Sequence, residues 1–349
     1  YLLKNRHLDF ATRTFKIALI AAFVSSVVQA GTGHWHAVQV AETQPIAHPA
    51  IPLPRDLYGA DRVNSAGVNL ADESAVLTLA SGMQPFARCR WDVQPILASG
   101  LGEEGGGSHD NVNPGRLNDV IGEVRQASLE ETEQAISDAC AFSEDWDRIP
   151  GSERARLLEK AADLMEQNSA EFLALCAREA GKTAHDAVAE VREAVDFLRY
   201  YALQARQRFD SPMALPGPTG EHNELSLHGK GVFVCISPWN FPLAIFTGQV
   251  SAALAAGNTV LAKPADQTPA VAALAVKTLH RAGVPVAALQ FVPGRGSVVG
   301  AKMTSDPRVA GVALTGSMET AHRINRSLAA RDAPLASFIA ETGGQNAML

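Results

Sequence analysis

The pattern of hydrophobic and polar positions changes near residue 231. Upstream, between about residues 128 and 209, apolar residues recur at the three- and four-residue spacing of amphipathic helices. Downstream, short apolar runs alternate with helical stretches. These runs lie at 231–236, 258–263, 288–292, 309–314 and 336–341. Alternation of strands and helices predicts a parallel sheet with helices packed on its faces, which is an α/β fold.

The upstream part contains signals for individual elements. Ser128 followed by Glu131 is a capping box, which predicts a helix that begins there and runs to about residue 142. Alternating apolar and polar residues over 119–128 predict an edge strand. Two further helices are predicted, at 152–179 and at 184–209.

The first third of the chain carries weaker patterns. We predict an extended linker over 48–115, because 48–73 is rich in Pro, Gly, Asn and Asp and a glycine cluster follows at 100–115. Residues 1–47 stay unassigned. Within them the apolar run 17–30 has features of a secretory signal but is too short to cross a membrane. A buried helix and an out-of-frame sequence are the alternative interpretations.

Composition and charge exclude several classes of protein. The 349 residues are 46% hydrophobic and 19% charged, as in ordinary globular proteins. A net charge of −7 argues against a nucleic-acid-binding protein. The cysteines form no Cys-x-x-Cys pair, which indicates reduced thiols in a cytoplasmic protein. His34 and His36 have no third ligand nearby in sequence, so no metal site is predicted.

Candidate chemistry gathers where the predicted strands end. The carboxyl ends of parallel strands lie at one edge of a sheet, and open α/β sheets bind ligands beyond that edge. The residues at the ends of successive strands are Ile236, Trp239 and Asn240, then Lys263 and Asp266, then Gly296, then Gly316 and Ser317, and finally Glu341. A helix that begins with Gly and Ser offers backbone N–H groups and a positive dipole end to an anion.

Each of these signals is weak alone. The glycines at 293–300 do not form a G-x-G-x-x-G fingerprint, because Val299 stands where the third glycine belongs. The sequence AGKT at 180–183 is not a P-loop, because Cys176 replaces the first glycine of that motif. A loop lysine, a turn amide and a turn carboxylate also need no ligand when taken singly. Their joint placement after successive strands favours a single site.

Longer stretches of the sequence resemble a known family. SPWNFPLAIFTGQVSAALAAGNTVLAKPADQTP, ALTGS and ETGGQNAM resemble the aldehyde dehydrogenase superfamily. IPLPRDLYGADRVNSAGVNLADE and REAGKTAHDAVAEVREAVDFLRYYA are similar to its bifunctional proline utilization A branch. The resemblance covers residues 48–349 and implies a Rossmann-like NAD-binding domain over 116–349. Residues 1–47 lie outside it and are explained equally by a frame error and by a remnant of a preceding domain.

The resemblance implies roles for the residues at the strand ends. Lys263 and Asp266 are expected on the adenosine ribose of NAD, and Ser317 on the pyrophosphate. Ile236, Trp239, Gly296 and Gly316 complete the implied cofactor site. Asn240 is expected to donate its amide N–H to the oxyanion of the reacting aldehyde, and Glu341 to act as general base. Asp266 stands where the family usually has Glu, and its negative charge favours NAD over NADP.

The implied reaction is the NAD-dependent oxidation of L-glutamate γ-semialdehyde, from pyrroline-5-carboxylate, to glutamate. Its nucleophile is a cysteine that the family places downstream of the Glu-Thr-Gly-Gly motif, and the sequence ends before that position. Cys235 is a poor substitute, because it lies inside an apolar strand. We therefore expect a fragment that lacks its nucleophile and is inactive alone.

Two alternatives remain open from the sequence. Another semialdehyde dehydrogenase of the superfamily would share the same motifs, and a non-catalytic NAD-binding or scaffold protein would need no nucleophile. The resemblance also implies a cytoplasmic parent protein and leaves open a peripheral location on the inner membrane. That parent would carry a proline dehydrogenase domain with FAD, take a small aldehyde as substrate and form homo-oligomers.

Overall fold

The computed structural model describes residues 51–100 and 105–343. The chain divides into two compact units, Tyr1–Leu53 and Pro54–Leu349, and the fold described below is that of the second. The predictions for the apolar run 17–30 and for the two histidines that follow it lie outside the described residues.

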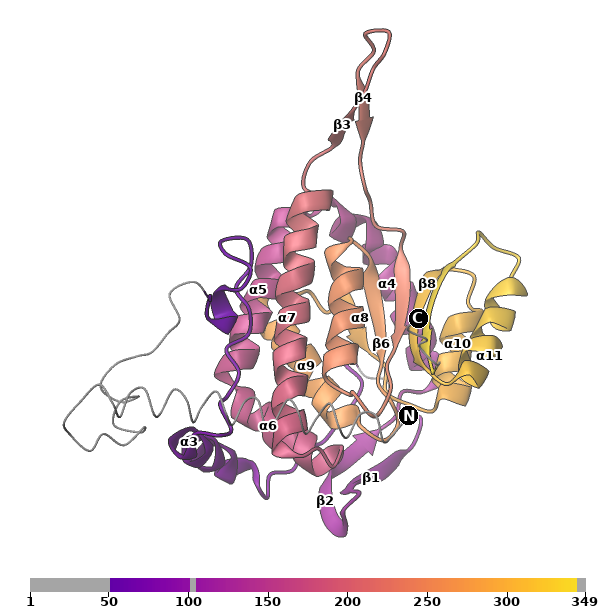
Figure 1. Cartoon of the computed structure of the whole chain (residues 1–349). Helices are drawn as coiled ribbons and strands as arrows, with labels where there is room; N and C mark the ends of the chain where they lie inside the picture. Colours follow the sequence, from indigo (N-terminus) through magenta and orange to yellow (C-terminus); the bar gives the residue numbers. More distant parts are fainter. Residues whose placement is uncertain (1–50, 101–104, 344–349) are drawn as a thin grey trace, which may run out of the picture. The chain divides into compact units, whose positions relative to one another are not determined.

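A five-stranded sheet forms the centre of the second unit (Figure 1). Strand β5 (Val232–Ile236) pairs in parallel with β6 (Thr259–Lys263) on one side and with β8 (Val309–Gly316) on the other. Strands β7 (Leu289–Phe291) and β9 (Ser337–Thr342) complete the order β7-β6-β5-β8-β9, and both also pair in parallel. All five predicted strands are present, and the α/β class is confirmed. The chain order reverses between β5 and β8, which makes that position the switch point of the sheet.

Helices cover both faces of this sheet. Because side chains alternate along a strand, Phe233 and Cys235 enter one hydrophobic core, while Val232 and Val234 enter the other. The helices of the first core are α5 (Gly151–Gln167), α6 (Ser169–Glu179), α7 (Ala184–Phe209), α8 (Ala244–Ala255) and α9 (Pro269–Ala282). Those of the second core are α4 (Leu129–Arg148), α10 (Ala301–Ser305) and α11 (Met318–Ala329). No helix in the described ranges is both long and apolar enough to cross a membrane.

The segment predicted as an extended linker contains regular elements. Helix α3 (Glu73–Met83) begins where the Asp72 carboxylate accepts a hydrogen bond from the backbone N–H of Ser74 at 2.9 Å. Strand β1 (Ser108–Asn113) pairs antiparallel with β2 (Arg116–Arg125). Two short 3-10 turns are also present, η1 (Pro54–Asp56) and η2 (Gln84–Phe86). The extended description is therefore wrong for these stretches, because a local cap and a hairpin partner give them regular structure.

Caps decide where the upstream helices begin and end. The capping box of α4 is present: Ser128 Oγ accepts from the Glu131 N–H at 3.1 Å, and the Ser128 N–H donates to Glu131 Oε2 at 2.9 Å. The helix runs beyond the predicted end near residue 142. The prediction of a single helix at 152–179 is wrong, because α5 ends and α6 begins on either side of Asn168. The side-chain amide of Asn168 donates to the Leu164 carbonyl at 2.7 Å and so caps the end of α5.

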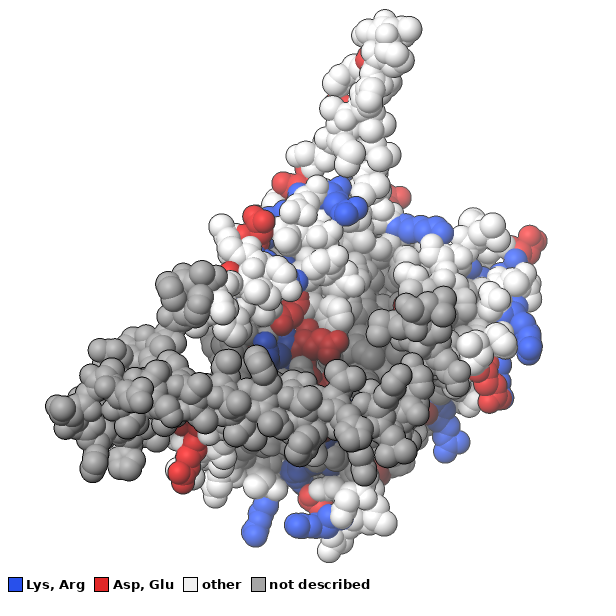
Figure 2. Space-filling model, in the orientation of Figure 1, with Lys and Arg blue, Asp and Glu red and all other residues white. Residues whose placement is uncertain are grey.

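A second hairpin, β3 (Met213–Leu215) with β4 (Asn223–Leu225), projects beyond α5 and α7 (Figure 1). Its residues are almost all exposed, so it adds nothing to either core. On the face drawn in Figure 2, this projection is mostly uncharged, whereas charged side chains of both signs are interspersed over the rest of the surface.

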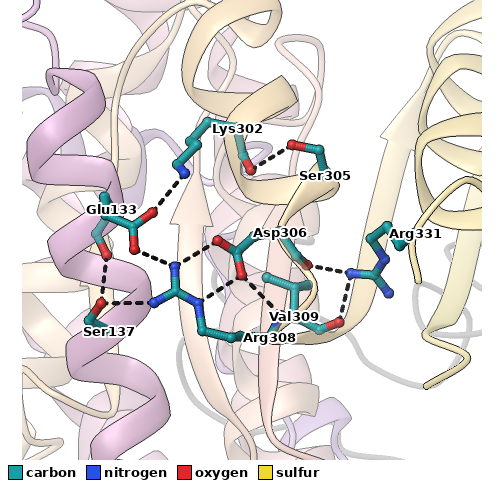
Figure 3. Close-up of polar contacts among 8 residues, drawn as sticks. All are labelled: Glu133, Ser137, Lys302, Ser305, Asp306, Arg308, Val309 and Arg331. Carbon is teal, nitrogen blue, oxygen red and sulfur yellow. Dashed lines mark hydrogen bonds and ion pairs between the residues drawn. The ribbon is translucent and has the colours of Figure 1, made fainter. Parts of the chain in front are cut away.

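A polar network joins the second helix layer to the sheet at the start of β8 (Figure 3). Arg308 donates from Nε and Nη2 to the two carboxylate oxygens of Asp306, at 2.8 and 2.7 Å, and this lowers the pKa of Asp306. Arg308 also pairs with Glu133 of α4, which contacts Lys302 of α10 at 2.7 Å. Arg331 donates to the Asp306 carbonyl at 2.6 Å. The network lies at the amino end of β8, whereas the candidate site lies at the carboxyl ends of the strands.

A buried arginine caps the carboxyl ends of two helices. Arg154 of α5 is 2% exposed and donates to backbone carbonyls at the ends of α4 and α8, including Asp147 at 3.0 Å and Ala255 at 3.1 Å. These carbonyls have no partner within their own helices, and the guanidinium also opposes the negative ends of the helix dipoles. Burial lowers the pKa of Arg154.

We expect the Arg154→Met variant to lose about 2–4 kcal/mol of unfolding free energy, because several buried carbonyls would lose their donor. Urea unfolding measures this loss. Arg156→Met is the matched control: Arg156 is on the same helix but pairs with Glu153 on the surface, so its loss should change stability by less than about 0.5 kcal/mol. Equal effects of the two variants would contradict the role given to Arg154.

Candidate active site

The parallel register aligns the ends of the central strands. Ile236 of β5 lies opposite Lys263 of β6 and Leu314 of β8. One residue further along β8, Thr315 lies opposite Glu341 of β9. The strand ends that sequence analysis singled out therefore meet at a single edge of the sheet, beside the switch point.

The loop from β5 to α8 leaves this edge with its polar residues exposed. Its first residue, Ser237, is buried, and its N–H donates to the Lys263 carbonyl at 3.2 Å, which extends the pairing of β5 with β6. Trp239 is 58% exposed, and Asn240 next to it is exposed as well. Helix α8 begins at Ala244. The short loop thus presents an indole and a carboxamide beyond the strand ends.

Lys263 is a buried side chain, not a solvated loop lysine. It is 4% exposed, and its Nζ donates to Asp266 Oδ1 at 2.8 Å and to the Pro264 carbonyl at 2.9 Å. Its methylenes run beside the turn η3 (Gly296–Gly300): a Cβ at Gly296 would lie 3.8 Å from Lys263 Cε. The structure therefore brings Lys263, Asp266 and Gly296 together.

The two predicted glycine-led helix starts differ. After β7, η3 is a single π-helical turn that continues into the five-residue α10, too short for a substantial dipole. After β8, the 12-residue α11 begins with Ser317, whose Oγ accepts from the Thr320 N–H at 3.2 Å. Gly316 is half-buried and Ser317 is exposed. We therefore still expect the start of α11 to bind an anion, and we no longer expect this of the short turn η3.

Glu341 lies within strand β9 instead of after it. The ladder with β8 continues through Thr342, so Glu341 is held as an exposed strand residue. Ile339, two residues earlier and on the same face, is 54% exposed. The backbone of Glu341 is therefore held at the same edge as Ile236, two strands away, which is about 10 Å by ordinary strand spacing.

Gln249 of α8 links the two strands at the switch point. Oriented to satisfy both ends of its amide, it donates to the Ile236 carbonyl at 3.2 Å and accepts from the Thr315 N–H at 3.1 Å. It also accepts from Thr315 Oγ1 at 3.0 Å. Sequence analysis did not single out Gln249, because a glutamine in an apolar helix gives no motif.

A cavity of about 700 Å³ lies beside Asp266. Its other walls come from residues 106–109 before and within β1, residues 126–130 at the start of α4, and Arg295 and Val298 of the loop and turn after β7. Sequence analysis missed residues 106–109 and 126–130, because only the pairing of β1 with β2 brings these two stretches together beside Asp266. The Asp266 carboxylate, 41% exposed, thus borders both Lys263 and an open space.

Comparison with known proteins identifies the fold. Residues 102–349 match the model described as the aldehyde dehydrogenase family. The chain belongs to the aldehyde dehydrogenase family. It is 49% identical to the bifunctional protein PutA of Klebsiella aerogenes over 87% of this chain, and 40% identical to a 1-pyrroline-5-carboxylate dehydrogenase of Bacillus mycoides over 68%. The structure of 1-pyrroline-5-carboxylate dehydrogenase from Thermus with bound NAD is similar, with a TM-score of 0.74, 33% identity and 81% of this chain covered.

These relatives are longer than the matched region. The chain spans 22% of the Klebsiella protein, 47% of the Bacillus protein and 55% of the Thermus chain. Residues 1–53, which sequence analysis left almost wholly unassigned, match a different model, described as cytochrome bd terminal oxidase subunit I. The family assignment therefore applies to residues 102–349.

The four cysteines of the sequence lie on different elements, and two of them are fully buried. Cys235 is fully buried in the middle of the sheet, where burial raises the pKa of its thiol to about 12. Cys176 is fully buried in α6, and burial raises its pKa as well. Cys140 lies on α4, and the neighbouring Ala139 carbonyl accepts from Thr259 at the amino end of β6. Cys89 follows η2. Burial argues against Cys176 and Cys235 as reactive thiols.

Metal binding by clustered side chains finds no support in the described residues. No group of three or more His, Cys, Asp or Glu side chains there could hold a metal ion.

A buried carboxylate supports the loop that carries Asp266. Glu179, the last residue of α6, is 2% exposed and accepts from the backbone N–H groups of Ala270 and Val271 at 2.7 and 2.8 Å, in the first turn of α9. It also accepts from the Asn111 amide. Burial raises the pKa of Glu179 to about 7, against the three hydrogen bonds that lower it. Sequence analysis missed Glu179, whose only signal is an acid at the end of a helix.

We expect this carboxyl to make the stability of the fold pH-dependent. Its folded pKa of about 7 lies above the unfolded value of 4.5, so the folded state binds the proton more tightly. The protonated group's advantage is fully present below about pH 4.5 and is lost as pH rises through about 7, a change of about 3 kcal/mol. Glu179→Gln should remove this dependence. Parallel curves of unfolding free energy against pH, for the wild type and the variant between pH 5 and 8, would contradict it.

Proposed function

We propose that this chain carries the NAD-binding part of an enzyme that oxidises L-glutamate γ-semialdehyde, formed from 1-pyrroline-5-carboxylate, to L-glutamate. The observation that carries the proposal is the common sheet edge, where Lys263 with Asp266 and the start of α11 flank the switch point. The names of the relatives support the substrate, and the NAD bound in the Thermus protein supports the cofactor. We propose further that the chain works within a bifunctional protein, with a proline dehydrogenase domain as its partner.

The donors and acceptors at this edge fit NAD. An ammonium group has three donors, and contacts among the described residues use two of those of Lys263, which leaves one for a ribose hydroxyl. Asp266 Oδ2 can accept from the same sugar, and the carboxylate disfavours a 2′-phosphate. The N-terminus of α11, with Gly316 and Ser317, suits the pyrophosphate. Ile236, Trp239 and Gly296 line the remaining proposed surface.

The proposed chemistry uses two further side chains. When bound, NAD supplies the hydride acceptor. Asn240 would donate its amide N–H to the substrate oxygen as negative charge develops there. Glu341 would be the general base that takes the proton of the nucleophile, or of the water that hydrolyses the acyl group after hydride transfer. The exposed position of both residues at the same sheet edge supports these roles.

The proposal assigns no nucleophile to the four cysteines of this sequence. Covalent oxidation of an aldehyde needs a thiolate beside the substrate. Cys176 and Cys235 are buried. Cys89 follows η2 and Cys140 lies within α4, so neither belongs to a loop that follows a strand of the sheet. We therefore propose a role for the residues at the strand ends in binding and orienting the cofactor.

Replacing Lys263 tests the cofactor site directly. Lys263→Met should raise the Kd for NAD by about 10-fold to 100-fold, because a charge-assisted hydrogen bond is worth about 1.5–3 kcal/mol. Isothermal titration calorimetry on the 349-residue chain measures this change. Lys277→Met, which removes an exposed lysine of α9, is the control and should bind NAD like the wild type. Unchanged NAD affinity in Lys263→Met would contradict the site.

Substrate preference tests the proposed reaction. For the complete protein encoded by the gene, we expect kcat/KM with 1-pyrroline-5-carboxylate and NAD to exceed that with succinate semialdehyde by at least about 100-fold, since a site built for a substrate's polar groups rejects analogues that lack them. The rate of NADH formation measures both. A preference for succinate semialdehyde would favour another semialdehyde dehydrogenase instead.

A further inference from the structure

A second buried carboxylate holds the loop that carries Asn240. Glu190 of α7 is 2% exposed, and its Oε2 accepts from the backbone N–H groups of Leu243 and Ala244, at 3.2 and 2.9 Å. These are the N-cap residue and the first residue of α8, directly after the Asn240 loop. The carboxylate therefore takes up helix N–H groups that have no partner within the helix, and it fixes where the loop ends.

Lys182 completes this support. It follows Gly181 in the turn between α6 and α7, and its Nζ lies 2.8 Å from Glu190 Oε1. The same ammonium lies 4.3 Å from the centre of the Phe241 ring, within cation–π range. Phe241 is the neighbour of Asn240. Lys182 belongs to the AGKT stretch at 180–183, which is not a P-loop. In the structure it contacts Glu190 and Phe241.

We propose that Lys182 and Glu190 are positioning residues that hold the Asn240 amide in line with the oxygen of the reacting aldehyde. The inference rests on the proposed function, because it needs Asn240 to contact the substrate. Lys182 and Glu190 do not themselves touch the substrate. They contact the loop through Phe241, Leu243 and Ala244.

The chain before Asn240 is held separately. Ser237 pairs with the end of β6, and Gln249 holds the carbonyl of Ile236. With its start held by the sheet and its end held by the Lys182–Glu190 pair, the loop has little freedom, and a displacement of about 1 Å is enough to weaken a donor aimed at a transition state. Loss of the pair should therefore lower kcat with little change in KM.

A double-mutant cycle with Asn240 tests the inference on the complete protein encoded by the gene. With NAD and 1-pyrroline-5-carboxylate, Asn240→Ala should lower kcat by about 10²-fold to 10³-fold, as for other oxyanion donors. Lys182→Met should lower kcat by about 10-fold to 100-fold. In the Asn240→Ala background, Lys182→Met should change kcat by less than about threefold, because the amide that the pair positions is already gone.

Conservative and matched variants separate positioning from general damage. Lys182→Arg keeps the positive charge and should retain kcat within about threefold. Arg199, elsewhere on α7, is largely buried and pairs with the more exposed Asp163 and Glu166 of α5. Arg199→Met removes these pairs, and it should lower the thermal midpoint while leaving kcat within about twofold.

The kcat values of these variants distinguish a failure of the positioning role from a failure of the proposed function. If Asn240→Ala lowers kcat but the effects of Asn240→Ala and Lys182→Met multiply, or if Lys182→Met leaves kcat unchanged, the positioning role is overturned and the proposed function stands. If Asn240→Ala itself leaves kcat unchanged, the role of Asn240 in the proposed function fails, and the positioning role fails with it. Should Lys182→Met not fold, Glu190→Gln takes its place in the cycle, with the same expected non-additivity.

Discussion

The parallel pairing of β5 with both of its neighbours is the constraint on which the site depends. It places Ile236, Lys263 and Leu314 at one level, and the pairing of β8 with β9 extends that level to Ala340. A slip of one residue in any of these ladders would turn the terminal side chain to the opposite face of the sheet. Residues of β5, β6 and β8 are mostly buried, and a slip of one of these strands would move its apolar side chains from one core to the other.

The loops beyond this edge are held by carboxylates from the first helix layer. Glu179 accepts from the first turn of α9, and Glu190 accepts from the start of α8. In each case an acidic side chain of one helix accepts from backbone N–H groups at the start of another helix. Those N–H groups have no partner within their own helix. Helices α6 and α7 therefore do more than cover the sheet, since they determine where the Asp266 and Asn240 loops end.

Periodicity and family motifs together predicted most of this arrangement. The five strands, the capping box at Ser128 and the 184–209 helix follow from local pattern, which depends only on nearby residues. The break at Asn168 and the strand before β2 were not predicted, because a side chain that satisfies a carbonyl and a hairpin partner leave little periodic signal.

The candidate site divides in the same way. Residues within recognisable motifs, such as Lys263 and Ser317, could be named as candidates from sequence, and the structure brings Lys263 and Asp266 into contact. Glu190 and Gln249 could not, because their partners are backbone groups far along the chain. The one available signal for Glu190 is a charge on the apolar stripe of its helix, between Ala187 and Ala194.

The central claim is that a dinucleotide binds along the carboxyl edge of the sheet. The most direct measurement is a crystal structure of the 349-residue chain with NAD. The account predicts the adenosine ribose against Lys263 and Asp266, with the pyrophosphate at the first turn of α11. Density for NAD confined to the cavity between residues 106–109 and 126–130, without contact to Lys263 or Ser317, would contradict it.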